Sequence, residues 1–80
     1  MSKSQVGEKH SKLYLHEAMT LVLKRYGDKG LRPQDLADII FNERLYLTQS
    51  GSKADINQIY ARRAKYPHIF DLVNGIVKLR

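Results

Sequence analysis

Basic and amide side chains near the C-terminus are the residues of this chain whose types and spacing suit a chemical role. Residues 53–80 hold six Lys or Arg residues against two Asp residues, whereas residues 13–52 hold five basic and five acidic residues. Lys and Arg neutralise phosphates, and Asn, Gln and Arg form paired hydrogen bonds with base edges in the major groove. The pattern therefore predicts contacts to nucleic acid. The candidate contact residues are Lys53, Asn57, Gln58, Arg62, Arg63, Lys65, Lys78 and Arg80.

Enzyme chemistry is not indicated by the remaining polar residues. The chain has no Cys, which excludes a disulfide framework, a zinc finger and a thiol nucleophile. His10, His16 and His68 do not share the spacing of metal ligands, and Gly27 and Gly30 lack the Lys-Ser/Thr pair of a phosphate-binding loop. We therefore expect a non-enzymatic protein with no catalytic residue, no metal site and no cofactor.

Length and charge limit the class of protein further. The 80 residues suffice for one small domain, and the net charge is +6. No apolar run approaches the roughly 18–20 residues of a membrane span, and the N-terminal residues lack the apolar stretch of a secretory signal. We expect a cytoplasmic protein without membrane contacts, associated with the nucleoid if it is bacterial. Residues 1–11, which carry Lys3 and Lys9, are predicted to form a disordered basic arm before a domain over 12–80.

Apolar residues at three- and four-residue spacing predict two helices in the first half of the chain. The first spans about 12–26, with Ser11 as its N-cap and Gly27 as the left-handed residue that ends it. The second begins at Pro33, which suits the first position of a helix, and closes near Leu47.

A third helix is predicted after a tight connection. A capping box from Ser52 to Asp55 opens it, and it stops by Tyr66 because Pro67 disfavours helical geometry in the residue before it. Its inward residues are expected to be Ile56, Ile59, Tyr60 and Ala64. Four tyrosines are assigned to the core or its edge, which leaves Tyr66 as the one candidate for stacking on a nucleic-acid base. The four are Tyr14, Tyr26, Tyr46 and Tyr60.

The last twelve residues predict a β-hairpin. Asn74-Gly75 is the preferred pair for a two-residue type I′ turn, and it lies between two apolar segments. The loop length sets the register and places Asp71 opposite Lys78. Leu31 is expected to add a short third strand. Four apolar residues then share the face toward the helices. They are Phe70, Leu72, Val77 and Leu79.

Three helices followed by a hairpin predict a mainly helical winged helix-turn-helix with a C-terminal wing. Residues 14–80 resemble the HARE-HTH domains, a winged-helix family found in restriction and DNA-modification proteins, chromatin regulators and the delta subunit of bacterial RNA polymerase. The matching residues are Tyr14, Glu17, Ala18, Leu45, Tyr46, Gly51, Ser52, Phe70, Gly75 and Leu79. The chain departs from the family at Tyr14, which is often Trp, and at Lys53-Ala54, where Thr-Pro is usual. The resemblance implies the fold, while winged helices differ in what they bind.

The sequence predicts a winged helix that binds double-stranded DNA, as a small module associated with transcription or DNA modification. The third helix would enter the major groove and the wing would reach the backbone. Asn57 and Gln58 suit adenine, Arg62 suits guanine, and the other cations suit phosphates. The alternative is a winged helix that binds protein, either a partner in the transcription machinery or a second copy through Val73 and Ile76. We expect a monomer or a weak homodimer.

Overall fold

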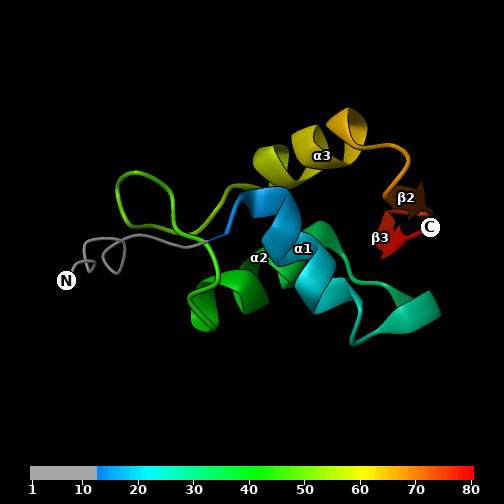
Figure 1. The fold of residues 1–80 in the computed structure, drawn as a ribbon, viewed down its shortest axis with the longest axis horizontal. Helices are drawn as coiled ribbons and strands as arrows, with labels where there is room; N and C mark the ends of the chain where they lie inside the picture. Colours follow the sequence, from blue (N-terminus) through cyan, green and yellow to red (C-terminus); the bar gives the residue numbers. More distant parts are fainter. Residues whose placement is uncertain (1–12) are drawn as a thin grey trace, which may run out of the picture.

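The chain has the predicted order of three helices and a C-terminal hairpin. A computed structural model describes residues 13–80, so the arm predicted over 1–11 lies outside the described residues. Figure 1 shows the hairpin at one end of the helices and the connection over 43–55 at the other. This is the arrangement of a winged helix, which confirms the predicted fold class. The elements are α1 (Leu15–Leu23), the short 3-10 helix η2 (Gly27–Lys29), α2 (Pro33–Asn42), α3 (Ile56–Lys65), β2 (Phe70–Val73) and β3 (Ile76–Leu79).

Helix α1 is shorter at both ends than predicted. Its N-cap is Tyr14 and not Ser11, and the Tyr14 backbone N–H donates to the Glu17 carboxylate at 2.9 Å. This bond satisfies one of the backbone donors that a helix start leaves unpaired. After Leu23 the chain tightens into three-residue turns that lead to Gly27, whose φ of 55° confirms the predicted left-handed conformation. The helix therefore ends before this glycine and not beside it.

Helix α2 begins at Pro33 as predicted but ends at Asn42, before the predicted Leu47. Arg44 adopts φ 55°, and its N–H donates to the Phe41 carbonyl at 3.0 Å. The next N–H, that of Leu45, donates to the Ile40 carbonyl at 3.0 Å. These two bonds form a Schellman motif, which usually has Gly at the left-handed position. Because Arg stands there instead, the sequence does not reveal this helix end.

Helix α3 begins at Ile56, so the capping box predicted from Ser52 is wrong. Asp55 is the N-cap, and its backbone N–H donates to the Gln58 amide oxygen at 2.8 Å. The predicted end is confirmed, because α3 stops at Lys65, ahead of Pro67. With α2 shortened as well, residues 43–55 join the two helices, and the connection is longer than the tight turn that we predicted.

The hairpin is confirmed in turn and register. Asn74 and Gly75 have φ values of 51° and 79°, as a type I′ turn requires. The pairs are Phe70 with Leu79, Asp71 with Lys78, Leu72 with Val77, and Val73 with Ile76. The predicted third strand is present as a single bridge, in which Leu31 and Val77 exchange two backbone hydrogen bonds of 2.9 and 2.8 Å.

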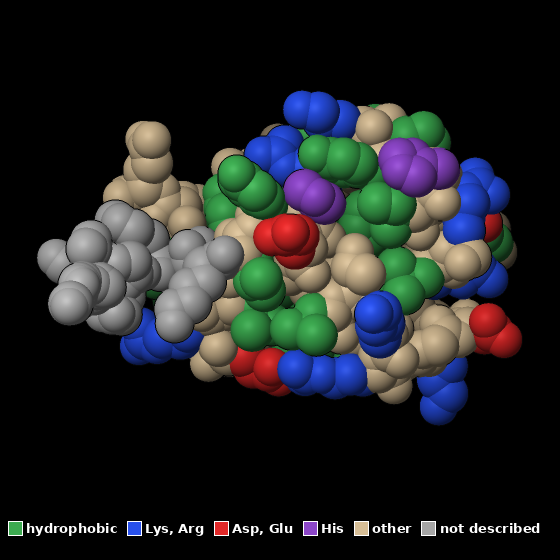
Figure 2. Space-filling model, viewed as in Figure 1, with side chains coloured by type: hydrophobic (Ala, Val, Ile, Leu, Met, Phe, Trp, Pro, Cys, Tyr) green, Lys and Arg blue, Asp and Glu red, His purple; other side chains and the backbone are tan. Residues whose placement is uncertain are grey.

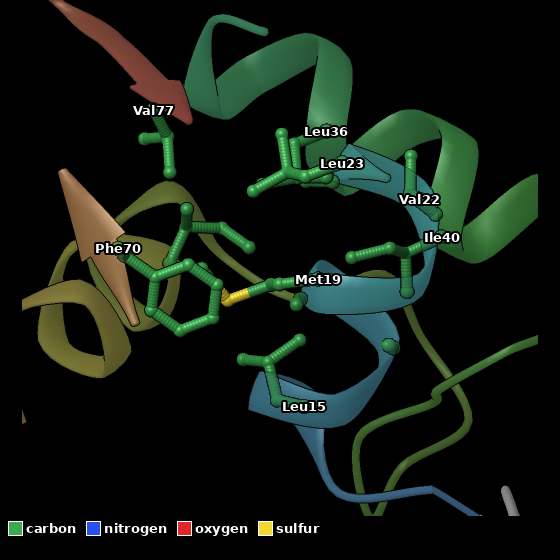
Figure 3. Close-up of a cluster of buried hydrophobic side chains, with 12 residues drawn as sticks. Leu15, Met19, Val22, Leu23, Leu36, Ile40, Phe70 and Val77 are labelled. Carbon is green, nitrogen blue, oxygen red and sulfur yellow. The ribbon is translucent and has the colours of Figure 1, made fainter. Parts of the chain in front are cut away.

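The hydrophobic core lies where the helices meet the hairpin. In Figure 3 the side chains of α1 face those of α2 on one side and those of the hairpin on the other. Each large apolar side chain buried in this way contributes about 1.5–3 kcal/mol relative to an exposed one. The hairpin is anchored by this packing, since an isolated two-stranded ribbon is marginally stable. The largest buried residues are Leu15, Met19, Val22, Leu23, Leu36, Ile40, Ile59, Phe70 and Val77.

Candidate nucleic-acid interface

Helix α3 presents an open face to solvent, because Ile59 is its one buried residue. Successive residues turn by about 100° around a helix axis, which fixes the residues on the side away from Ile59. We call these exposed residues the α3 outer face. They are Asn57, Ala61, Ala64 and Lys65. The helix contains no acidic residue, and its last turn carries three basic residues. The electrostatic field of this helix is therefore positive.

Three residues predicted to point inward are exposed, and one of them, Ala64, lies on the α3 outer face. Ile56 is 39% exposed and Tyr60 is 38% exposed, because α3 rests on the core through Ile59 and these neighbours lie at the edge of the contact. Ile56 and Tyr60 line a hollow of about 210 Å³ that brings α3 together with the start of α2 and the turn of the wing. The other lining residues of this wing-tip hollow are Arg32, Pro33, Gln34 and Gly75.

Two of the predicted contact residues already have partners within the fold. The Gln58 amide oxygen accepts the Asp55 N–H at the start of α3, and Gln58 is half-buried. Lys53 precedes the helix, and its Nζ lies 2.6 Å from the Asp38 carboxylate. Asn57, in contrast, is exposed, and its side-chain amide has no hydrogen-bond partner among residues 13–80. Asn57 is therefore the amide best placed to contact a base.

Arg62 and Arg63 lie on opposite flanks of α3 and not at the centre of its exposed side. Both are half-buried, since each is next to the side of the helix that carries Ile59. The Nε of Arg63 is buried without a hydrogen-bond partner in the described part of the chain. Arg62 lines a pocket near Lys65 at the end of the helix. The three basic residues of the last turn thus spread around the helix.

The wing carries two basic residues, Lys78 and Arg80, and the Arg80 side chain folds back onto the hairpin. Arg80 donates from Nε to the Pro67 carbonyl at 2.6 Å, and its Nη2 lies 3.8 Å from the Asp71 carboxylate. Asp71 and Lys78 face each other as predicted, but the ion pair that Asp71 makes is with Arg80. Lys78 is half-buried. The wing therefore carries two cations, one of which is partly neutralised.

Sequence reasoning missed an aromatic group beside Arg62. Tyr14, which we assigned to the core or its edge, is 72% exposed, and its ring stacks on that of His16. His16 stacks in turn on Tyr66, which belongs to the distant end of α3. Since the group forms only when α1 and α3 pack together, no local pattern in the sequence indicates it.

The described residues contain no group of three or more His, Cys, Asp or Glu side chains arranged to hold a metal ion. Over the same range, 13–80, the helices are too short and too polar for any of them to cross a bilayer.

The fold is that of a winged helix with an acid-free third helix. Comparison of the chain with protein-family models, with curated proteins and with solved structures finds no match. The resemblance to the HARE-HTH domains therefore stays a prediction.

Proposed function

We propose that the chain is a non-enzymatic winged-helix domain that binds double-stranded DNA through α3 and the wing. The observation that supports this most directly is the α3 outer face, where the unpartnered amide of Asn57 lies on a helix with three basic and no acidic residues. As a small module of this kind, it would act in transcription or DNA modification.

The dimensions of α3 fit a major groove. Its ten residues span about 15 Å along the axis, and a helix diameter of about 10–12 Å matches a groove about 12 Å wide. Ala61 and Ala64 are small, so the helix backbone can approach the base edges closely. Asn57 is the residue proposed to read a base, since Asn pairs with the N6 and N7 edge of adenine.

The cations are assigned to the phosphates. Arg62, which the sequence assigned to guanine, lies on a flank of α3 and is proposed here to contact a phosphate instead. Lys65 and Arg62 lie at the end of α3, while Lys78 and Arg80 lie on the wing, so contacts from both elements would straddle one groove. Lys53 and Gln58 join the interface only if they exchange their present partners for DNA. Basic residues in a last turn also stabilise the helix dipole, so binding and stability must be measured separately.

A second candidate function has its own supporting observation. Ile56, Tyr60 and Val73 are 38–42% exposed, and the first two line the wing-tip hollow. Exposed apolar side chains that gather beside a hollow are typical of a surface that binds protein. The competing hypothesis is a winged helix that docks a protein partner or a second copy of itself.

Duplex binding at several salt concentrations tests the first proposal. We expect fluorescence anisotropy of a labelled blunt duplex to show affinity that falls with salt, with a log-log slope of roughly −3 to −6. The double variant Arg62→Gln/Lys65→Gln removes two phosphate contacts and should make the slope less negative by about 2. Glutamine keeps part of each stem, which limits the loss of packing.

The matched control is Lys24→Gln/Arg44→Gln. It removes the same charge from exposed positions just after α1 and just after α2, outside α3 and the wing. The control is expected to bind the duplex nearly as well as the unaltered chain. If the two double variants weaken binding equally, or if no duplex binding occurs at low salt, the assignment to α3 is wrong. Thermal melting followed by circular dichroism confirms that each variant is folded.

A further inference from the structure

A row of aromatic rings crosses the surface from the start of α1 to the end of α3 and the segment after it. The Tyr14 and His16 rings are nearly parallel, with centroids 5.9 Å apart and planes at 8°. The His16 and Tyr66 rings stack more closely, at 4.1 Å and 22°. His68 follows Tyr66 at 6.3 Å with a tilt of 59°. We call these four residues the aromatic ladder.

The aromatic ladder is a surface feature and not an extension of the core. Tyr14 at its end is 72% exposed, so most of that ring is open to solvent. Three of its rings line a pocket of about 260 Å³, whose other walls are Leu15, Tyr46, Arg62 and Lys65. In Figure 2 the histidine side chains lie among hydrophobic side chains on one face, with Lys and Arg side chains beside them.

The charge beside the aromatic ladder is positive. Arg62 and Lys65 both line the pocket, and no acidic side chain is among its lining residues. The Lys65 Nζ lies 6.0 Å from the centroid of the Tyr66 ring, which keeps a cation next to the stacked rings. One acid lies beside the aromatic ladder outside the pocket, because the Glu17 carboxylate accepts the Tyr14 backbone N–H, so two cations face one anion there.

We propose that the pocket and the aromatic ladder bind an unpaired nucleotide of a single strand. The base stacks on the open face of Tyr14, and the adjoining phosphates lie against Arg62 and Lys65. Stacked aromatic side chains beside cations are how proteins hold single strands without reading their sequence. Charge complementarity favours this occupant, because two cations and no acid line the pocket. A neutral planar molecule would stack on the rings but would make no ion pair with Arg62 or Lys65.

This site is distinct from the proposed duplex interface but shares Arg62 and Lys65 with it. Tyr14 and His16 belong to the aromatic ladder alone, since the α3 outer face and the wing contain neither. Variants of Tyr14 therefore separate the two proposals. Because its side chain is largely exposed, Tyr14→Ala is expected to fold, and circular dichroism checks this.

The test measures binding of a labelled oligothymidylate of about ten nucleotides, a length within the range that one small domain covers. We expect Tyr14→Ala to weaken this binding about five- to tenfold, as loss of one stacked base predicts, and Tyr14→Phe to retain it. An oligonucleotide of the same length with abasic sugars keeps the phosphates and loses the bases. It should bind the unaltered chain as weakly as the intact strand binds Tyr14→Ala.

Tyr26→Ala is the matched control, because it removes a partly exposed tyrosine from the opposite end of α1. It should leave oligothymidylate binding unchanged. The same measurements with oligouridylate show whether the site prefers DNA or RNA. The proposal is supported if Tyr14→Ala weakens binding of whichever strand binds more tightly. Equal binding of the abasic and intact strands, or no effect of Tyr14→Ala, overturns it.

The blunt duplex distinguishes failure of this proposal from failure of the proposed function. Tyr14→Ala is expected to bind the blunt duplex as tightly as the unaltered chain does. If the duplex does not bind while the single strand binds through Tyr14, the duplex proposal is wrong and the nucleotide site stands. The reverse result rejects the nucleotide site alone.

Discussion

Arg44 is a single residue whose backbone decides where α2 ends. Its φ of 55° is in the left-handed region, which costs a residue with a Cβ about 1–2 kcal/mol relative to glycine. We therefore expect Arg44→Gly to raise the free energy of unfolding by up to about 1 kcal/mol, after the greater entropy of the unfolded glycine chain is subtracted. Urea denaturation measures the change. The control is Asn42→Gly, two residues earlier at the right-handed end of α2, which should instead lower stability by about 0.3 kcal/mol.

Gly30 is required for two reasons, its positive φ of 62° and the close approach of the wing. A Cβ there would lie 2.5 Å from the Val77 carbonyl oxygen and 2.7 Å from the Ile76 side chain. Gly30→Ala is expected to cost about 2–4 kcal/mol, since backbone strain and overpacking act together. Gly27→Ala has the same sign of φ with no atom within 4 Å of its added Cβ, so it isolates the strain. Equal losses in the two variants, measured by urea denaturation, would contradict the role of wing contact.

At the scale of elements, one ion pair joins the ends of α1 and α2. The Arg25 guanidinium contacts both oxygens of the Glu43 carboxylate at 2.7 Å. Hydrogen bonding by Arg25 lowers the pKa of Glu43 below its ordinary value. The Glu43 carboxyl therefore binds a proton less tightly in the folded state than in the unfolded chain. The ion pair stabilises the fold at pH values above the ordinary glutamate pKa. That stabilisation is lost as pH falls through the lowered pKa.

Glu43→Gln tests this pH dependence. The variant should be less stable than the unaltered chain at pH 7, and the difference should be smaller at pH 3, below the usual glutamate range. Urea denaturation at both values provides the comparison. Asp28→Asn, which removes an exposed acid without an ion pair in the described structure, is the control. A difference for Glu43→Gln that persists undiminished at low pH would rule out titration of this carboxylate as its cause.

The elements also show how far the sequence predicts this fold. The hairpin was predictable to the residue, because Asn74-Gly75 specifies the turn and the turn specifies the register. The start of α1 and the end of α2 were not, because Tyr14 takes a position that usually needs Ser, Thr, Asp or Asn and Arg44 takes a conformation that usually needs glycine. Pro33 and Pro67, in contrast, correctly marked the start of α2 and the end of α3. Local chemistry therefore predicted the strands better than the helices.

The candidate site was predictable by residue type and less so by position. A basic, acid-free third helix is visible in the sequence, and Asn57 and Lys65 lie on its exposed side as expected. The partners of Lys53 and Gln58 could not be predicted from the sequence. The Lys53 ammonium can pair with Asp38 or with a phosphate, and only the fold shows that Asp38 lies beside it. The aromatic ladder depends on contact between α1 and α3, which the spacing of residues along the sequence does not predict.

At the scale of the whole molecule, positive charge argues against self-association. Each chain carries +6, so two copies repel, and a stable interface needs roughly 800 Å² from each partner. Seven large apolar side chains are exposed among residues 13–80, and Val73 at the wing turn, which the dimer hypothesis invokes, is 42% exposed.

We therefore expect size-exclusion chromatography with light scattering to give a monomer, and Val73→Ser to leave its mass unchanged. The measurement is repeated at high salt, which screens the repulsion and leaves apolar association intact. A dimer that forms at high salt and is lost in Val73→Ser would favour the protein-binding hypothesis over the duplex proposal. A monomer under both conditions that forms a one-to-one complex with a short duplex supports a single chain acting through α3 and the wing.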